Sequence, residues 1–331
     1  MPDSTQTQPV AFNCEGGLVL NRSSFLMQPG EALVLENFEP DVEGGYRRMN
    51  GFRRYVNHIV PHTASINEKV IGVAKFGNKV IACRGEKIFS AASTELSFAI
   101  TAAATMSGSG TIIVDSVAGF ATSGTLQIDS ELFTYTGVDS ASKPNEFTGV
   151  TRSSASTTAT AHVTKITVSS TWTEIDTGRT NASKYRFERF NYDGNEKLIC
   201  VDGVNAPVVF NLALSATDVS TAAVVGSKFV VSFKSHMFYA GKSTTPELLN
   251  FSEGFNEDGF SAGVADPAGS IRVDDTITGL KVFRDSLIIF CENRIFKLTG
   301  SVASDFAIIP VTRSIGCING DTIQEFGGDL V

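Results

Sequence analysis

The chain has 331 residues and a formal net charge of −8, so it is long enough for two domains or for one large β domain with an insertion. This acidic balance argues against a protein that wraps a nucleic acid over its whole surface, because the phosphates would be repelled. Charged residues make up only 19% of the chain, while glycine, serine and threonine are plentiful, which favours short strands and tight turns over helices.

Residues 1–60 are predicted to form an N-terminal arm followed by a docking segment. The stretch GYRRMNGFRRY, from Gly45 to Tyr55, contains a turn at Asn50-Gly51 and four arginines: Arg47, Arg48, Arg53 and Arg54. Neighbouring side chains of an extended strand point to opposite sides, so these guanidinium groups cannot form one flat row along a phosphate backbone. The segment is therefore predicted to dock onto another protein or to form salt bridges within an assembly, with phosphate binding as the alternative.

A pattern of three or four short strands recurs four times along the chain. The copies are Val73–Phe89, Phe187–Phe210, Val230–Phe251 and Leu280–Gly300. In each copy the first strand ends in Phe, a polar turn follows, and the middle strand is a short continuous apolar run, as expected for a sheet that is covered on both faces. Repeated meanders of this kind predict the blades of a β-propeller, with an ordinary β-sandwich as the alternative.

The segment 96–169 has a different composition from the rest of the chain. Serine, threonine and alanine dominate it, lysine and arginine almost vanish, and apolar residues alternate with polar ones at a period of two. This predicts a small β-module inserted into a blade. The expected fold is thus all-β, an incomplete or partial β-propeller-like set of meander blades with an inserted small β-domain.

The domain boundaries follow from these patterns. Residues 61–95 are predicted to form the first propeller-type blade, 96–169 the inserted module, and 170–331 further blades. Four copies are few for a closed ring, so the blades are expected to continue beyond the chain. No apolar stretch approaches the roughly 20 residues of a membrane-spanning helix.

No catalytic, cofactor-binding or metal-ligating residues are predicted. His58 and His62 are four residues apart, but Pro61 separates them and no carboxylate lies between them, so a metalloprotease-type zinc site is not expected. The five cysteines form no CxxC pair, and Cys83, Cys200 and Cys291 lie in apolar runs typical of buried free thiols. The chain is therefore predicted not to be an enzyme and to carry no cofactor.

Three stretches resemble bacteriophage virion proteins. GGLVLNRSSFLMQPGEALVLENFEPDVEGGYRRMNGFRRY resembles the opening of tail nozzle and hub proteins of short-tailed phages, and DSLIIFCENRIFKLTGSVASDFAIIPVTRSIGCINGDTIQEFGGDLV resembles one of their blades. The segment from Thr111 to Arg152 is similar to a small β-module that recurs in phage virion proteins.

The resemblance implies a structural protein of the virion, made in the host cytoplasm. It implies self-association into a ring, as a hexamer, around the channel through which phage DNA passes. It also implies contacts with a tail adaptor and with tail fibre proteins. Two alternatives remain open at this point, a fibre-associated or receptor-binding protein and a polysaccharide-degrading tail enzyme.

Overall fold

The computed structural model describes residues 16–19, 23–28, 30–40, 46–49, 51, 69–141, 144–326 and 328–330. The chain separates into two units, Met1–Tyr55 and Val56–Val331. In the described residues every regular element is a strand or a short 3₁₀ turn, and α-helix is absent. The predicted all-β class is confirmed. No helix of the described segments has the length and hydropathy needed to cross a membrane.

The first unit contains two small paired elements. Strands β1 (Gly17–Leu18) and β2 (Glu31–Ala32) pair in parallel, and the 3₁₀ turn η1 (Ser24–Leu26) lies between them in the chain. Strands β3 (Phe38–Pro40) and β4 (Tyr46–Arg48) pair antiparallel, with Glu39 opposite Arg47.

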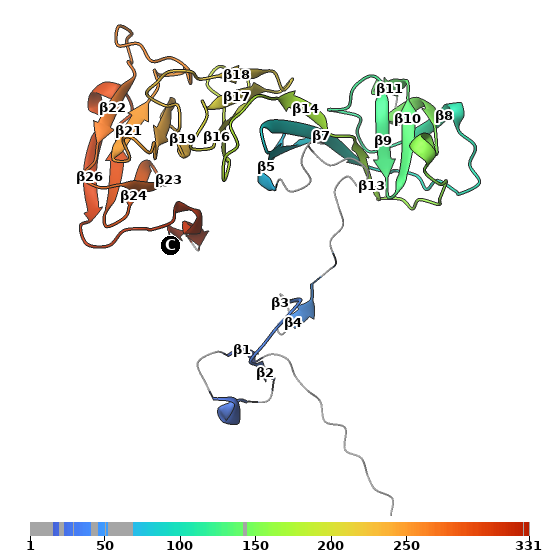
Figure 1. Ribbon diagram of the computed structural model, residues 1–331, viewed down its shortest axis with the longest axis horizontal. Coiled ribbons are helices and arrows are strands. Elements are labelled where there is room, and N and C mark those ends of the chain that lie inside the picture. Colours follow the sequence, from blue (N-terminus) through green and yellow to red (C-terminus); the bar gives the residue numbers. More distant parts are fainter. Residues whose placement is uncertain are drawn as a thin grey trace, which may run out of the picture. The chain divides into compact units, whose positions relative to one another are not determined.

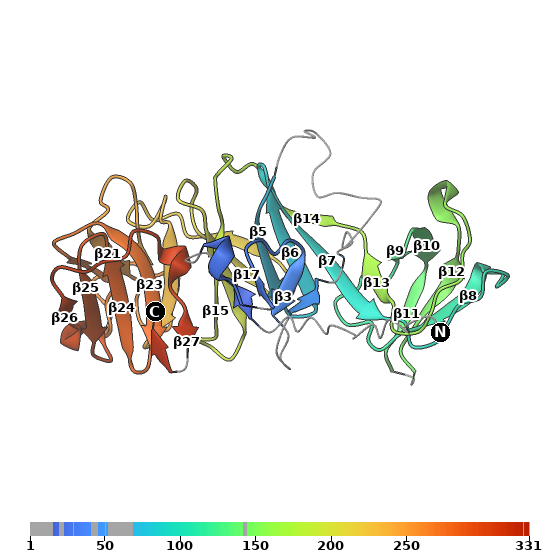
Figure 2. The ribbon, with the colours of Figure 1, turned by 90° about the horizontal axis from the view of Figure 1, so that it is seen from below.

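The second unit is built around four antiparallel four-stranded meanders, here called blades 1 to 4 (Figures 1 and 2). Blades 2 to 4 are separate four-stranded sheets, whereas blade 1 is part of a ten-stranded sheet that continues into the inserted module. Blade 1 consists of β5 (Val70–Phe76), β6 (Lys79–Arg84), β7 (Lys87–Glu95) and β14 (Thr173–Asp176). Blade 2 consists of β15 (Arg186–Phe190), β16 (Lys197–Val201), β17 (Val208–Asn211) and β18 (Ala216–Asp218). Blade 3 consists of β19 (Phe229–Phe233), β20 (His236–Ala240), β21 (Leu248–Phe251) and β22 (Gly269–Arg272). Blade 4 consists of β23 (Ile277–Phe283), β24 (Ser286–Cys291), β25 (Ile295–Thr299) and β26 (Ala307–Thr312).

Two-residue hairpins connect the first two strands of blades 1, 3 and 4, and a longer loop connects those of blade 2. In blade 3, Lys234 and Ser235 both have positive φ angles, of 48° and 66°, which is the pattern of a two-residue turn whose twist matches that of the flanking strands. In blade 1, Gly77 adopts a positive φ at the same position. The short polar turns of the sequence repeat therefore become hairpin loops, and each blade is a meander in chain order.

Successive blades pack face to face through alternating residues of the same strands. In β16, Leu198 and Cys200 contribute to a core shared with blade 1, whereas Ile199 and Val201 contribute to a core shared with blade 3. A third core joins blades 3 and 4 through residues such as Phe238. Because neighbouring side chains of a strand point to opposite faces, a strand covered on both faces must be apolar throughout. This explains the continuous apolar runs of the repeat, and the propeller-type packing is the predicted one.

The inserted module contains β8 (Ser107–Ile113), β9 (Gly124–Ile128), β10 (Glu131–Tyr135), β11 (Gly137–Asp139), β12 (Glu146–Thr151), η2 (Ser154–Ser156) and β13 (Thr167–Ser170). Its core is centred on Leu126, Phe133 and Phe147, which are fully buried. Strand β13 pairs with β9 on one side and with the end of β7 on the other. The module therefore grows out of blade 1 between its third and fourth strands.

The position of β14 corrects one predicted boundary. The segment from residue 170 onward was assigned to further blades, but Thr173 and Glu174 pair with Ser90 and Phe89 of β7. Blade 1 is completed only after the insertion, because β14 returns to the open edge of β7 and satisfies its backbone hydrogen-bonding groups. The boundary at residue 170 is thus too early.

The chain after blade 4 returns to the first strand of that blade. It contains η4 (Gly320–Thr322), β27 (Glu325–Phe326) and β28 (Asp329–Leu330). A further 3₁₀ turn, η3 (Ala303–Asp305), lies within blade 4 between β25 and β26. The amide of Cys317 donates to the carbonyl of Cys291 at 2.8 Å, and the hydroxyl of Thr278 donates to the carbonyl of Cys317. These bonds fix the segment that carries η4 beside β23.

Candidate functional site

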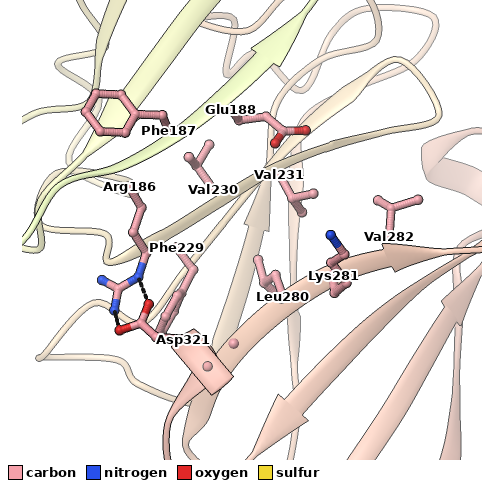
Figure 3. Close-up of a pocket in the computed structure, with 12 residues that line it drawn as sticks. Arg186, Phe187, Glu188, Phe229, Val230, Val231, Leu280, Lys281, Val282 and Asp321 are labelled. Carbon is pink, nitrogen blue, oxygen red and sulfur yellow. Dashed lines mark hydrogen bonds and ion pairs between the residues drawn. The ribbon is translucent and has the colours of Figure 1, made fainter. Parts of the chain in front are cut away.

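The first strands of blades 2, 3 and 4 lie next to one another and enclose a groove. Strand β19 packs beside both β15 and β23, and η4 approaches from the chain after blade 4. The groove has a volume of about 380 Å³ and is lined by side chains from all four of these elements (Figure 3). Charged groups from segments far apart in the sequence meet in this groove.

One end of the groove is formed by a charged clamp (Figure 3). The Arg186 guanidinium donates to both carboxylate oxygens of Asp321, at 3.2 and 3.1 Å, and lies over the ring of Phe229 with 4.8 Å between its Cζ and the ring centroid. Lys184 adds a second cation at 2.7 Å from the same carboxylate. Partial burial would raise the pKa of Asp321, but the hydrogen bonds from Lys184 and Arg186 outweigh it and lower that pKa. The carboxylate is therefore held ionised, as a fixed partner rather than a proton donor.

The other charges of the groove are Glu188 on β15 and Lys281 on β23. The pKa of Glu188 is raised, because burial outweighs the opposing effects of the Ser232 amide, which donates to it at 3.1 Å, and of Lys281. The groove thus holds two cationic and two acidic side chains. Such a balance offers no net attraction for a polyanion.

The size of the groove also limits what it can hold. A cube of 380 Å³ has an edge of about 7 Å, while the major groove of B-DNA is itself about 12 Å wide. A DNA duplex cannot occupy this space.

The predicted docking arginines are only partly within the described residues. Arg47 lies in β4, and its Nε donates to Glu39 at 2.8 Å across the β3–β4 hairpin. Arg48 is exposed and follows Arg47 on the same short strand. Arg53 and Arg54 lie outside the described residues, as do His58 and His62. Docking by these arginines stays a prediction.

A buried charge network in the inserted module was missed by sequence reasoning. Glu131 is fully buried and accepts two hydrogen bonds from Arg152, both at 2.8 Å, and one from the backbone amide of Thr160 at 3.0 Å. His162 lies 2.9 Å from Glu131 and 3.0 Å from Asp129 through its two ring nitrogens. Burial would raise the pKa of Glu131, but the bonds from Arg152, Thr160 and His162 outweigh it and lower that pKa to about 2.

This network gives a structural role to the charged residues of the module motif. The remaining guanidinium hydrogens of Arg152 are donated to the carbonyls of Thr101, Ala104 and Thr160. Glu131, Arg152 and His162 are thereby paired and hydrogen-bonded where they are buried, which is the condition under which buried charges are tolerated, while Asp129 is partly exposed. The signal available in the sequence was the pairing of an IDSE turn with a GVTR strand, but His162 lies outside both segments.

The second buried histidine joins blades 3 and 4. The ring of His236 contacts the carbonyl of Ser252 at 2.6 Å and Asp266 at 2.9 Å, and it packs edge-on against Phe306 with 5.1 Å between the ring centroids. Asp266 also accepts the backbone amide of Ala303. These contacts tie the connection between β21 and β22 to η3. Within the described residues, no group of three or more histidine, cysteine or acidic side chains is arranged to hold a metal ion.

The comparisons with known proteins identify no family. No family model matches the chain, and no curated protein matches it. Similar solved structures include the phage phi92 endosialidase, with 14% identity, a TM-score of 0.37 and coverage of 77% of this chain and 50% of that one. They also include the BBS1N–ARL6DN complex, with 7% identity, a TM-score of 0.28 and coverage of 74% and 68%. BamB from Moraxella catarrhalis has 11% identity, a TM-score of 0.25 and coverage of 66% of each chain.

The chain spans half the length of the phage endosialidase chain with which it aligns. All of these TM-scores are below 0.5. The strand pairing and the cores shared by neighbouring blades show the propeller-type architecture.

Proposed function

We propose that the chain is a structural component of a phage tail, and specifically a subunit of the tail nozzle. The observation that carries this proposal is the packing of the four blades into one body through three continuous apolar cores. Close-packed sheets of this kind are stiff, which suits a wall rather than a mobile enzyme domain. The resemblance of the opening and closing stretches to nozzle proteins supports the same assignment.

The proposed assembly is a sixfold ring of identical subunits. A closed ring needs a heterologous contact, in which one surface of each copy binds a different surface of the next. Two apolar surfaces that such a contact could use are exposed. Phe25 and Val34 of the first unit are 95% and 70% exposed, and Ile309 and Val311 of β26 are 42% and 55% exposed. The first unit would also dock the ring onto a tail adaptor, and tail fibre proteins would bind the assembled tail.

The proposal assigns no catalytic activity to the chain. In the groove, Asp321 is engaged by Arg186 and Lys184, so it is unsuited to donate a proton. Glu188 alone cannot supply both the acid and the base that glycoside hydrolysis by paired carboxylates requires. The groove is accordingly interpreted as a structural contact between the first strands of blades 2, 3 and 4.

The DNA channel is proposed to run between subunits, since the groove within one subunit is too small for a duplex. The net charge of −8 favours passage of the DNA without tight binding to the protein, because few positive charges are available to pair with the phosphates. This role also implies where the chain is found during infection. The chain would be made in the host cytoplasm and incorporated into the virion.

The decisive experiment is electron microscopy of purified virions in which this chain carries a label, together with a mass measurement of the purified protein. A sixfold ring with an axial pore at the distal end of the tail supports the nozzle. Trimers with outward-facing domains would instead support a receptor-binding protein. Degradation of host polysaccharide by the purified chain would contradict the non-enzymatic role.

The receptor-binding alternative is favoured by one specific feature. The inserted module and blade 1 border a second groove, of about 490 Å³, whose lining is rich in hydroxyl groups. Such a surface suits an uncharged hydroxyl-bearing ligand.

A further inference from the structure

The second groove lies where three parts of the chain converge. Its walls come from β6, β7 and β14 of blade 1, from β9, β10 and the preceding loop of the module, and from the turn between β17 and β18 of blade 2. Its volume of about 490 Å³ falls within the range of about 300–1,000 Å³ that is usual for small-molecule sites. Among the described residues of the second unit, no member of the charged clamp lines it.

The walls of this groove are fixed before any ligand arrives. The Tyr135 hydroxyl donates to the carbonyl of Ala121 at 3.0 Å and thereby holds the loop before β9 against β10. The ring of Phe120 packs edge-on against Phe147, with 5.0 Å between centroids. At the junction with blade 1, the hydroxyl oxygen of Ser170 in β13 accepts the amide of Ala92 in β7 at 2.9 Å. A preformed groove avoids the ordering cost that a flexible loop would add to binding.

The chemistry of the lining points to one class of ligand. Besides Tyr135, the ionisable side chains among the described residues that line the groove are Lys79 and Glu174, which have opposite signs, and Glu174 is paired with Lys87 at 2.6 Å. Within the described part of the chain, the hydroxyls of Thr125 and Thr173 have no protein hydrogen-bond partner. The half-buried Phe120 supplies an apolar ring beside these hydroxyls.

We propose that this groove binds a short, uncharged oligosaccharide. A sugar ring presents hydroxyls that replace water at Thr125 and Thr173, and an apolar C–H face that packs on an aromatic ring. A charged glycan is disfavoured, because the groove offers no uncompensated cluster of one sign. The proposal goes beyond the nozzle role and does not depend on it.

The test uses the full chain and two filling variants on opposite walls, Ala121→Trp in the module and Ala213→Trp in blade 2. Both alanines are exposed, so a bulky side chain enters the groove without disturbing a core. The matched control is Ala102→Trp, at an exposed alanine of the module that does not line the groove. Thermal unfolding of all three variants confirms that they remain folded.

Binding is measured by saturation-transfer NMR and calorimetry with a panel of neutral gluco-, galacto-, manno- and rhamno-oligosaccharides, and with sialylated and uronic-acid oligosaccharides of matched length. We expect at least one neutral probe to bind, at least a tenfold loss of affinity in both filling variants, and unchanged affinity in Ala102→Trp. Absence of binding by every neutral probe overturns the proposal. So does binding that survives both filling variants, or a preference for the acidic probes.

Discussion

Arg186 and Asp321 are 135 residues apart in the sequence, and their side chains form a bidentate ion pair at one end of the groove between the first strands of blades 2, 3 and 4. The pair joins the first strand of blade 2 to the 3₁₀ turn that follows blade 4. The first strand of blade 3 lies between the first strands of blades 2 and 4, so the ion pair spans blade 3. It holds the segment after blade 4 in place.

Replacing Arg186 by Ala is expected to loosen the segment that carries η4. The side chains of Arg186 and Asp321 are 26% and 32% exposed, so solvent screening keeps the expected loss of local stability at about 1 kcal/mol. Hydrogen exchange of residues 313–326 should become faster, while the core of blade 3 stays unchanged. The control is Arg294→Ala, which removes a more exposed pair with Asp274 and should leave exchange in 313–326 as it was. Unchanged exchange in Arg186→Ala would show that the clamp does not hold the segment.

Gly320→Ala tests the close backbone contact between η4 and β23. A Cβ at Gly320 would lie 2.3 Å from the carbonyl oxygen of Thr278 and 2.9 Å from the Cα of Gly279, so η4 must move away from β23. Limited proteolysis is expected to cut the segment after blade 4 faster in this variant. In Gly263→Ala, where nothing lies within 4 Å of the added Cβ, the rate should match that of the unmodified chain. Equal rates in both variants would count against close packing at Gly320.

The inserted module is expected to lose stability in acid. Lowering the pKa of Glu131 from its usual 4.5 to about 2 corresponds to about 3 kcal/mol of stability at neutral pH. Because the folded state holds the ionised form, this contribution is complete above pH 4.5 and is lost as the pH falls towards 2. Hydrogen exchange of residues 96–169 should accelerate in that range.

Glu131→Gln should remove most of this pH dependence and destabilise the module at pH 7, because Arg152 and His162 lose their carboxylate partner. Glu95→Gln, at a side chain that is 53% exposed, serves as the control and should leave the acid response in place. An identical acid response in Glu131→Gln would mean that another group is responsible.

The cysteines are expected to differ sharply in reactivity. Burial raises the pKa of Cys291 to about 12 and also raises the pKa of Cys83 and of Cys200, so little thiolate is available at neutral pH. In a background in which Cys14 is replaced by Ser, a thiol reagent should label Cys317 in the native protein. The other three should react only on unfolding. Labelling of the native protein that persists after Cys317→Ser would contradict this burial.

The predicted docking role of the four arginines can be tested by the assembly of phage particles that carry a variant of this chain. Replacing Arg47, Arg48, Arg53 and Arg54 with Ser should leave the unfolding of the blades unchanged but yield particles without a finished tail. Glu39→Gln is the control, because it breaks the hairpin ion pair of Arg47 and keeps every arginine. Particles that assemble and retain their DNA normally with the four serines present would exclude the docking role.

The sequence alone determined the strand content, the repeated meander and the presence of an inserted module. These follow from local rules, because a strand that is covered on both faces must be apolar at successive positions, as in Leu198 to Val201, and a two-residue turn must accept positive φ angles. The burial of Cys83, Cys200 and Cys291 follows from the same apolar runs.

Only the tertiary structure decided which distant segments meet. Strand β14 closes blade 1 after an insertion of more than seventy residues, Asp321 reaches Arg186, and His162 joins Glu131 and Arg152. No local pattern marks such partners, because a carboxylate in a turn has the same sequence signal whether it faces solvent or a buried guanidinium. The grooves share this origin, since their shape depends on how whole sheets pack and not on the residues of any one strand.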